Sequence, residues 1–237
     1  MAVRNRFLAF FYRLFLLAIG GYALYLLYKY HTQDVNDWTR PLYYFDFQTL
    51  LVAFVVIFAE VIANAIGLPK KTNGVVPGVW SPILLASLSY VLFDIVVYAT
   101  DVWAKGGHFF LGTSINFMLF SKIIFPALFL GDYLLFGEKG TVKWRHPIFW
   151  ELYPLFYFAF SLLVNLVWGH GFWAVDFFNS GIFIASKSVF AGNGGWNGVV
   201  ICSFLAWMGY FLIAYLTVFF NGLYAGAYRR SDPNDII

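Results

Sequence analysis

Residues 44–67 read YFDFQTLLVAFVVIFAEVIANAIG, a long apolar run in which only Asp46 and Glu60 carry a charge. About 20 consecutive apolar residues are enough for a helix to cross the hydrocarbon core of a bilayer. A charge at the centre of such a helix costs about 3 kcal/mol, so it usually faces the interior of a helix bundle and has a partner. The run therefore predicts a membrane-spanning helix whose carboxylates turn toward other helices.

The composition of the whole chain agrees with this reading. Of its 237 residues, 61% are hydrophobic and only 11% are charged, and the mean hydropathy is +0.73. A soluble domain of this size cannot bury so much apolar surface, whereas one compact bundle in lipid can. The net charge of +3 does not favour nucleic acid as a partner. The single cysteine, Cys202, excludes an internal disulfide framework and suggests no metal site, and we predict no cofactor.

Six stretches are long and apolar enough to span a membrane. They are 7–29, 44–67, 80–100, 110–136, 148–168 and 197–226. The sequence thus predicts an all-α, polytopic protein with one six-helix transmembrane domain over residues 1–237.

The distribution of Lys and Arg predicts the orientation of these spans. Most of these residues lie before the first span, in the second and fourth connections, and after the last span. Because positive charge accumulates on the cytoplasmic side, both termini should be cytoplasmic. The short tails show no retention or lipidation signal, which favours a bacterial cytoplasmic membrane, with the endoplasmic reticulum membrane as the alternative.

The connection at 169–197 is long, outward-facing and rich in aromatic residues. Such a segment is expected to lie in the membrane interface, where aromatic side chains are partly buried. The alternative is a lid that folds back over the mouth of the bundle.

Lys122 is the charge that lies deepest in the predicted spans. Pro126 follows one turn later and removes a backbone hydrogen bond, so the helix should kink beside the lysine. Glu60, Asp94 and Lys122 are expected to form a buried charge network, because depth favours Glu60 or Asp94 over Asp46 as the partner of Lys122. A later start of the fourth span, near Ser114, would instead move Lys122 toward Asp94 and Asp46.

The remaining ionisable residues are given simpler roles. His31, His108 and His146 fall in connections and are expected to be solvated. Asp132 and Glu151 lie near predicted cytoplasmic ends and are expected to touch water, and Arg13 should extend to the same interface. His170, beside the aromatic connection, is a candidate acid or base.

Several stretches resemble those of a known family. They are YYFDFQTLLVAF at 43–54, SKIIFPALFLGDYLLF at 121–136, WRHPIFWELYPLFYFAFSLL at 144–163 and GFWAVDFFN at 171–179. With them the chain resembles, over nearly its whole length, the androgen-induced-protein family of six-span membrane proteins and its bacterial counterparts. The resemblance implies a threonine-type hydrolase of fatty-acid esters, with a threonine on the second span as nucleophile and a histidine on the fourth as base.

This chain departs from that pattern at both catalytic positions. Asp46 stands where the resemblance implies the threonine, and Lys122 or Ser121 stands in place of the histidine. Thr49, one turn away, is an alternative nucleophile, and Asp46 with Lys122 is an alternative catalytic pair. A third reading is that the acid and the lysine replaced the catalytic pair together and form a salt bridge in a retained fold.

Three functions follow from these readings. The first is a relative of membrane-embedded hydrolases of fatty-acid esters, with its catalytic pair altered. The second is a non-catalytic protein that binds membrane lipids or a fatty-acyl ligand, or that serves as a subunit with a membrane protein partner. A small transporter is the weakest, because the sequence has no inverted repeat.

Overall fold

The computed structural model describes residues 5–33, 38–68, 80–104, 118–168 and 196–230. Every element in these ranges is helical, which confirms the predicted all-α class for the described part of the chain. In chain order the elements are α1 (Arg6–Thr32), η1 (Arg40–Tyr43), α2 (Phe45–Gly67), α3 (Ser81–Ala104), η3 (Leu119–Ile124), α5 (Phe125–Phe136), α6 (His146–Trp150), α7 (Leu152–Trp168) and α9 (Trp196–Arg230).

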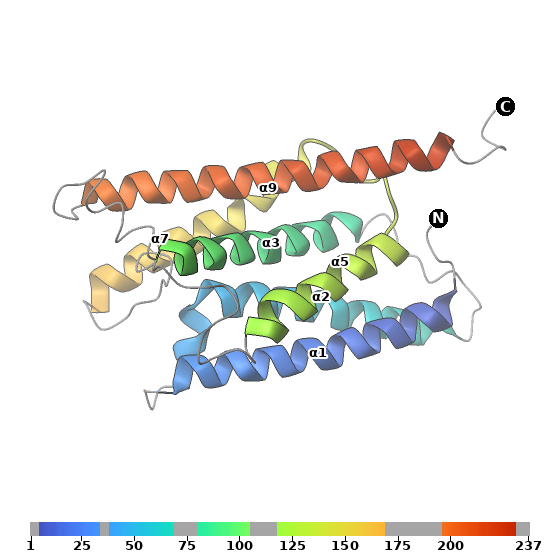
Figure 1. Cartoon of the computed structure of the whole chain (residues 1–237), viewed down its shortest axis with the longest axis horizontal. Helices are drawn as coiled ribbons and strands as arrows, with labels where there is room; N and C mark the ends of the chain where they lie inside the picture. Colours follow the sequence, from blue (N-terminus) through green and yellow to red (C-terminus); the bar gives the residue numbers. More distant parts are fainter. Residues whose placement is uncertain (1–4, 34–37, 69–79, 105–117, 169–195, 231–237) are drawn as a thin grey trace.

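The long helices run side by side in a bundle. Helix α1 packs against α2 and against the fourth span formed by η3 and α5, α2 packs against α3, and α3 packs against α9. In Figure 1, α1 and α9 form opposite edges of the bundle, and the start of α1 lies at the same end as the end of α9.

Within the described residues, five helical segments are long and apolar enough to cross a membrane. They are Arg6–Thr32, Phe45–Gly67, Ser81–Ala99, Leu119–Phe136 and Phe204–Gly226. These segments confirm a multi-pass membrane protein and match five of the six predicted spans. The stretch predicted at 148–168 is also helical, but it is divided at Glu151 between α6 and α7, and α7 has only 17 residues. The aromatic connection lies outside the described residues except for its last two positions, which begin α9.

Helix α1 has one buried face, made by residues three or four apart. Its members are Ala9, Arg13, Leu16, Gly20, Ala23, Leu27 and His31. Gly20 allows the fourth span to approach closely, because a Cβ atom there would lie 2.7 Å from Cε2 of Phe125. The helix begins at Asn5, whose side chain accepts hydrogen bonds from the backbone N–H groups of Phe7 and Leu8.

The fourth span changes its helical geometry beside Lys122. Residues 119–124 form a π-helix, in which the N–H of Phe125 bonds to the carbonyl of Phe120. Pro126 has no N–H to donate to the carbonyl of Lys122, four residues earlier, so the ordinary α-helical bond cannot form there. The helix is therefore irregular beside the lysine, where it forms a π-helical turn, a feature often found at functional sites. The kink itself stays a prediction.

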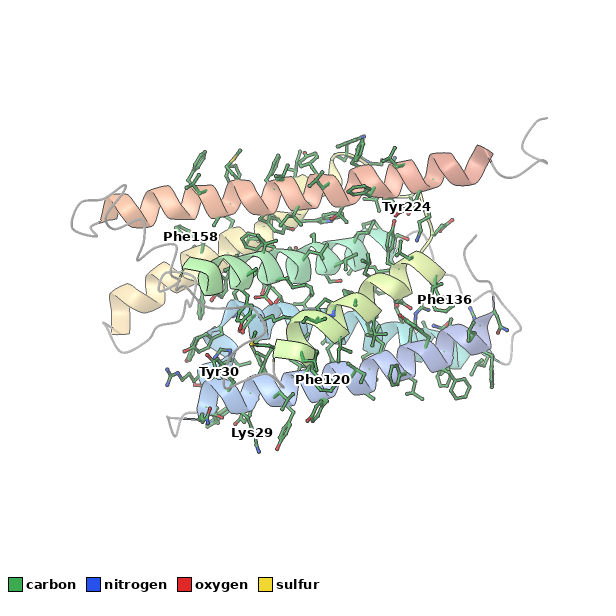
Figure 2. All side chains as sticks on the ribbon, viewed as in Figure 1. Lys29, Tyr30, Phe120, Phe136, Phe158 and Tyr224 are labelled. Atoms are coloured by element: carbon green, nitrogen blue, oxygen red, sulfur yellow. The ribbon has the colours of Figure 1, made fainter. Side chains whose placement is uncertain are left out.

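A polar contact joins α9 to the end of the fourth span. The Tyr133 hydroxyl donates to Oδ1 of Asn221 at 2.6 Å, and the N–H of Gly140 donates to the same oxygen at 3.2 Å. Gly140 has φ of 78°, a left-handed conformation that glycine adopts without strain. By contrast, many apolar side chains of α9 project away from the bundle (Figure 2).

Candidate functional site

Lys122 lies at the centre of a buried group of ionisable side chains. Its Nζ atom is 2.6 Å from Oδ2 of Asp94 and 3.5 Å from Oδ2 of Asp46. The other oxygen of Asp46, Oδ1, is 3.0 Å from Nε2 of His31. We refer to His31, Asp46, Asp94 and Lys122 as the Lys122 cluster. Four helical elements meet there, because α1, α2, α3 and η3 each contribute one of these residues.

The ends of two helices position His31 and Asp46. His31 lies in the last turn of α1, where a positive charge is favourable, and Asp46 lies in the first turn of α2, where a negative charge is favourable. Asp46 also accepts a hydrogen bond of 2.7 Å from the N–H of Phe47. The His31 ring stacks on the ring of Tyr44 with centroids 3.8 Å apart, which holds the imidazole against the carboxylate.

The surroundings of Lys122 favour its charged form. Only 3% of the residue is exposed, and Nζ also lies 5.4 Å from the centre of the Tyr98 ring, a distance typical of a cation–π contact. Two carboxylates attract the ammonium group in an environment of low dielectric constant. A general base must be neutral to accept a proton, so a lysine in this position is poorly suited to that role.

The structure brings together some of the predicted site residues and separates others. Asp94 and Asp46 both contact Lys122. These contacts agree with the alternative prediction, in which a later start of the fourth span moves Lys122 toward these two residues. Glu60, predicted to share a charge network with Asp94 and Lys122, instead pairs with Arg13. Glu60 is 14 positions after Asp46 on α2, or about 21 Å along the helix.

Arg13, Glu60 and Asp132 form a second buried group, which we call the Arg13 cluster. Nε of Arg13 is 2.8 Å from Oδ1 of Asp132 and 3.1 Å from Oε2 of Glu60. The guanidinium group also lies 5.4 Å from the centre of the Phe136 ring. The Arg13 cluster lies between α1, α2 and the fourth span formed by η3 and α5. These three spans also hold His31, Asp46 and Lys122, at the opposite end of the bundle.

The expected contacts of Arg13 and Asp132 with the membrane surface and water are wrong. Arg13 is 1% exposed and Asp132 is 0% exposed. Each lies on the inner face of its helix, so their opposite charges pair inside the bundle. Glu151, also expected to touch water, is only 8% exposed.

Both candidate nucleophiles, Thr49 and Ser121, are buried. The Thr49 hydroxyl donates to the backbone carbonyl of Asp46 on its own helix at 3.0 Å, a common local bond of threonine in helices. Ser121 is 3% exposed and lies in the π-helix next to Lys122. His170, the candidate acid or base, lies outside the described residues, as does His108.

His31 was missed by sequence reasoning, which placed it in a solvated connection. It is 5% exposed. A signal was available, since a short connection between two spans brings the end of the first beside the start of the second. His31 and Asp46 flank such a connection. His146, also expected to be solvated, is the first residue of α6 and is partly buried, and its Nδ1 atom accepts a hydrogen bond from the N–H of Lys143.

Within the described ranges, no group of three or more His, Cys, Asp or Glu side chains is arranged to hold a metal ion. Comparisons with protein-family models, with curated proteins and with solved structures find no match to this chain.

Proposed function

We propose that this chain is a six-span membrane protein of the androgen-induced-protein type, in which a buried ion pair has replaced the catalytic pair and which binds a fatty-acyl lipid without hydrolysing it. Its host is the bacterial cytoplasmic membrane, with the endoplasmic reticulum membrane as the alternative. One observation carries the non-catalytic assignment: the contact of the Lys122 ammonium with Asp94 at 2.6 Å and with Asp46 at 3.5 Å.

The bundle geometry supports six crossings and two cytoplasmic termini. The first residues of α1 and the last of α9 lie at one end of the bundle (Figure 1), which requires an even number of crossings between them. Five segments are long enough on their own. The pair α6 and α7, which together extend from His146 to Trp168, supplies the sixth. Labelling of single cysteines introduced at exposed Glu138 and in the connection after α1 would test this topology.

The local chemistry supports a non-catalytic role. Hydrolysis through a hydroxyl nucleophile requires a base within hydrogen-bonding distance of the hydroxyl. Thr49 donates instead to a backbone carbonyl, and Lys122 is held as an ammonium ion by two carboxylates. The Lys122 cluster thus holds together four helical elements, α1, α2, α3 and η3, which is a structural role.

A second candidate, a subunit of a membrane assembly, is favoured by α9. This helix has 35 residues, about 52 Å of length, and lies at the edge of the bundle. Its large exposed side chains include Phe204, Leu212, Phe219, Phe220 and Leu223. Such a face is suited either to lipid or to the helix of a partner.

The experiment is mass spectrometry of lipids that co-purify with the protein, together with turnover of a long-chain fatty-acid ester after reconstitution. We expect a fatty-acyl lipid near one per chain and no turnover above that of empty vesicles. The matched variants are Thr49→Ala and Thr217→Ala, because Thr217 makes a similar hydrogen bond within α9, a helix that contributes no residue to the Lys122 cluster. Turnover lost only in Thr49→Ala would establish a hydrolase and overturn the proposal. A stable complex with another protein, without bound lipid, would favour the subunit.

A further inference from the structure

Glu60 is a buried carboxylate whose oxygens accept no hydrogen bond from any described donor. Its side chain is 8% exposed, and Oε2 lies 3.1 Å from Nε of Arg13. That nitrogen carries a single hydrogen, and Oδ1 of Asp132 accepts it at 2.8 Å. Asp132 also receives a weaker bond of 3.4 Å from Nη2 of the same guanidinium. Glu60 therefore has a nearby positive charge, but no described residue gives it a hydrogen bond that would compensate for its burial.

An ionised carboxylate in this position carries a large desolvation free energy. Removing a charged group from water costs several kcal/mol unless hydrogen bonds and an opposite charge replace the water. Here one guanidinium faces two carboxylates, and two acids in contact with the same cation are most stable when one of them holds a proton. A protonated carboxyl is neutral and can donate its hydrogen to the neighbouring carboxylate.

We propose that Glu60 and Asp132 together form a proton-binding site, which holds one exchangeable proton between the two carboxyl groups beside Arg13. The ligand is the proton itself, and the arrangement is the one that membrane proteins use where an intramembrane acid takes up and releases protons. This site is independent of the Lys122 cluster and of the proposed loss of hydrolysis.

The two cations near the site do not fully compensate the charges that two ionised carboxylates would carry. Arg13 comes from α1, and Lys139 comes from the connection that follows α5. The Lys139 ammonium donates to the carbonyls of Tyr133 and Gly137, and not to either carboxylate. Burial lowers the pKa of Lys139 to about 8, and attraction to Asp132 offsets part of this effect. Its charge is therefore a weaker and more distant compensation than that of Arg13.

The neutral groups around the site bond elsewhere. On α2, the side-chain amide of Asn64 donates to the backbone carbonyl of Glu60 at 3.0 Å rather than to its carboxylate. On α1, the Tyr12 hydroxyl donates to the carbonyl of Leu128 at 2.8 Å. Neither supplies the hydrogen bond that an ionised Glu60 would need.

The position of the site suits exchange with one side of the membrane. Glu60 lies seven residues before the end of α2, about 10 Å along the helix, and Asp132 lies four residues before the end of α5, about 6 Å. Both helix ends lie on the side that we propose to be cytoplasmic. Protons should therefore reach the site from the cytoplasm.

The test is infrared spectroscopy of the reconstituted protein at pH 7, which detects the carbonyl stretch of a protonated carboxyl and its shift in deuterated water. We compare wild type with Glu60→Gln, which has the shape of the protonated residue. The matched controls are Glu138→Gln, at an exposed position, and Glu151→Gln, at a second buried acid. We expect a protonated-carboxyl band in wild type whose deuterium-sensitive part is lost in Glu60→Gln and kept in both controls.

A second variant keeps the proposal testable if Glu60→Gln does not fold. Asp132→Asn leaves one carboxylate beside Arg13, so Glu60 should become ionised and the same part of the band should disappear. Absence of the band in wild type, or its full retention in Glu60→Gln or Asp132→Asn, would overturn the proposal.

Discussion

Replacing Lys122 by methionine should be among the most destabilising single changes in the chain. Methionine keeps much of the length of the side chain but removes its charge, which leaves the buried Asp94 and the partly buried Asp46 near each other without their shared cation. At an effective dielectric constant near 20, the attraction is about 6 kcal/mol for the contact of 2.6 Å and about 5 kcal/mol for the contact of 3.5 Å. Desolvation cancels much of this gain, and loss of one partner from a buried ion pair typically costs about 3–5 kcal/mol.

The double variant Lys122→Met with Asp94→Asn separates the ion pair from a general packing defect. With Asp94 neutral, the remaining carboxylate of Asp46 is accompanied by His31 at 3.0 Å. The double variant should therefore recover more than half of the stability that Lys122→Met loses, because replacing both members of a buried ion pair is often nearly neutral.

The assay is reversible unfolding in mixed micelles with increasing sodium dodecyl sulfate, applied to wild type, both single variants and the double variant. A coupling energy between Lys122 and Asp94 of about 2 kcal/mol or more is expected, since contacting residues are not additive. A loss below about 1 kcal/mol in Lys122→Met, or strictly additive effects, would refute the reasoning.

Two further predictions concern other parts of the bundle. Gly20→Ala should cost about 1–3 kcal/mol, because its Cβ would lie 2.7 Å from the fully buried ring of Phe125, whereas Gly21→Ala, with its nearest contact at 3.6 Å, should be close to neutral in the same unfolding assay. Lys139, with a pKa lowered by burial to about 8, should titrate near that value by NMR of methylated lysines. Because the unfolded chain keeps the Lys139 proton up to about 10.5, stability should rise with pH between about 8 and 10.5, and Lys139→Gln should lack this rise.

The architecture could be predicted from the sequence because apolar length is a strong and local signal. Five of the predicted spans correspond to long apolar helices. The ends of the first three differ from the prediction by at most three residues, whereas the described fourth and last segments begin nine and seven residues later than predicted. The stretch at 148–168 was harder to assign. Its Pro154 and the break at Glu151 divide the helix, so hydropathy alone does not give its length.

The pairing of the charges was less predictable. Depth along a straight helix depends on where the helix begins, and an error of one turn moves a side chain by about 5 Å. Glu60 and Asp46 lie about 21 Å apart on α2, so an error of about two turns in the depth of Lys122 is enough to exchange one for the other as its neighbour. Arg13 and Asp132 could not be paired by sequence because each lies near a helix end, where an exposed position is equally compatible with the pattern.

The measurement that tests the central claim most directly is covalent labelling of the folded, reconstituted protein with a lipid-like fluorophosphonate, followed by mass spectrometry of the modified peptides. A site in which Lys122 is held by Asp46 and Asp94 offers no neutral lysine as a base, so we predict that Thr49 and Ser121 are labelled no more than buried Ser87, which bonds to its own helix. Rapid labelling of Thr49 or Ser121, abolished by the corresponding alanine variant, would contradict the account and show that this fold has retained a working nucleophile.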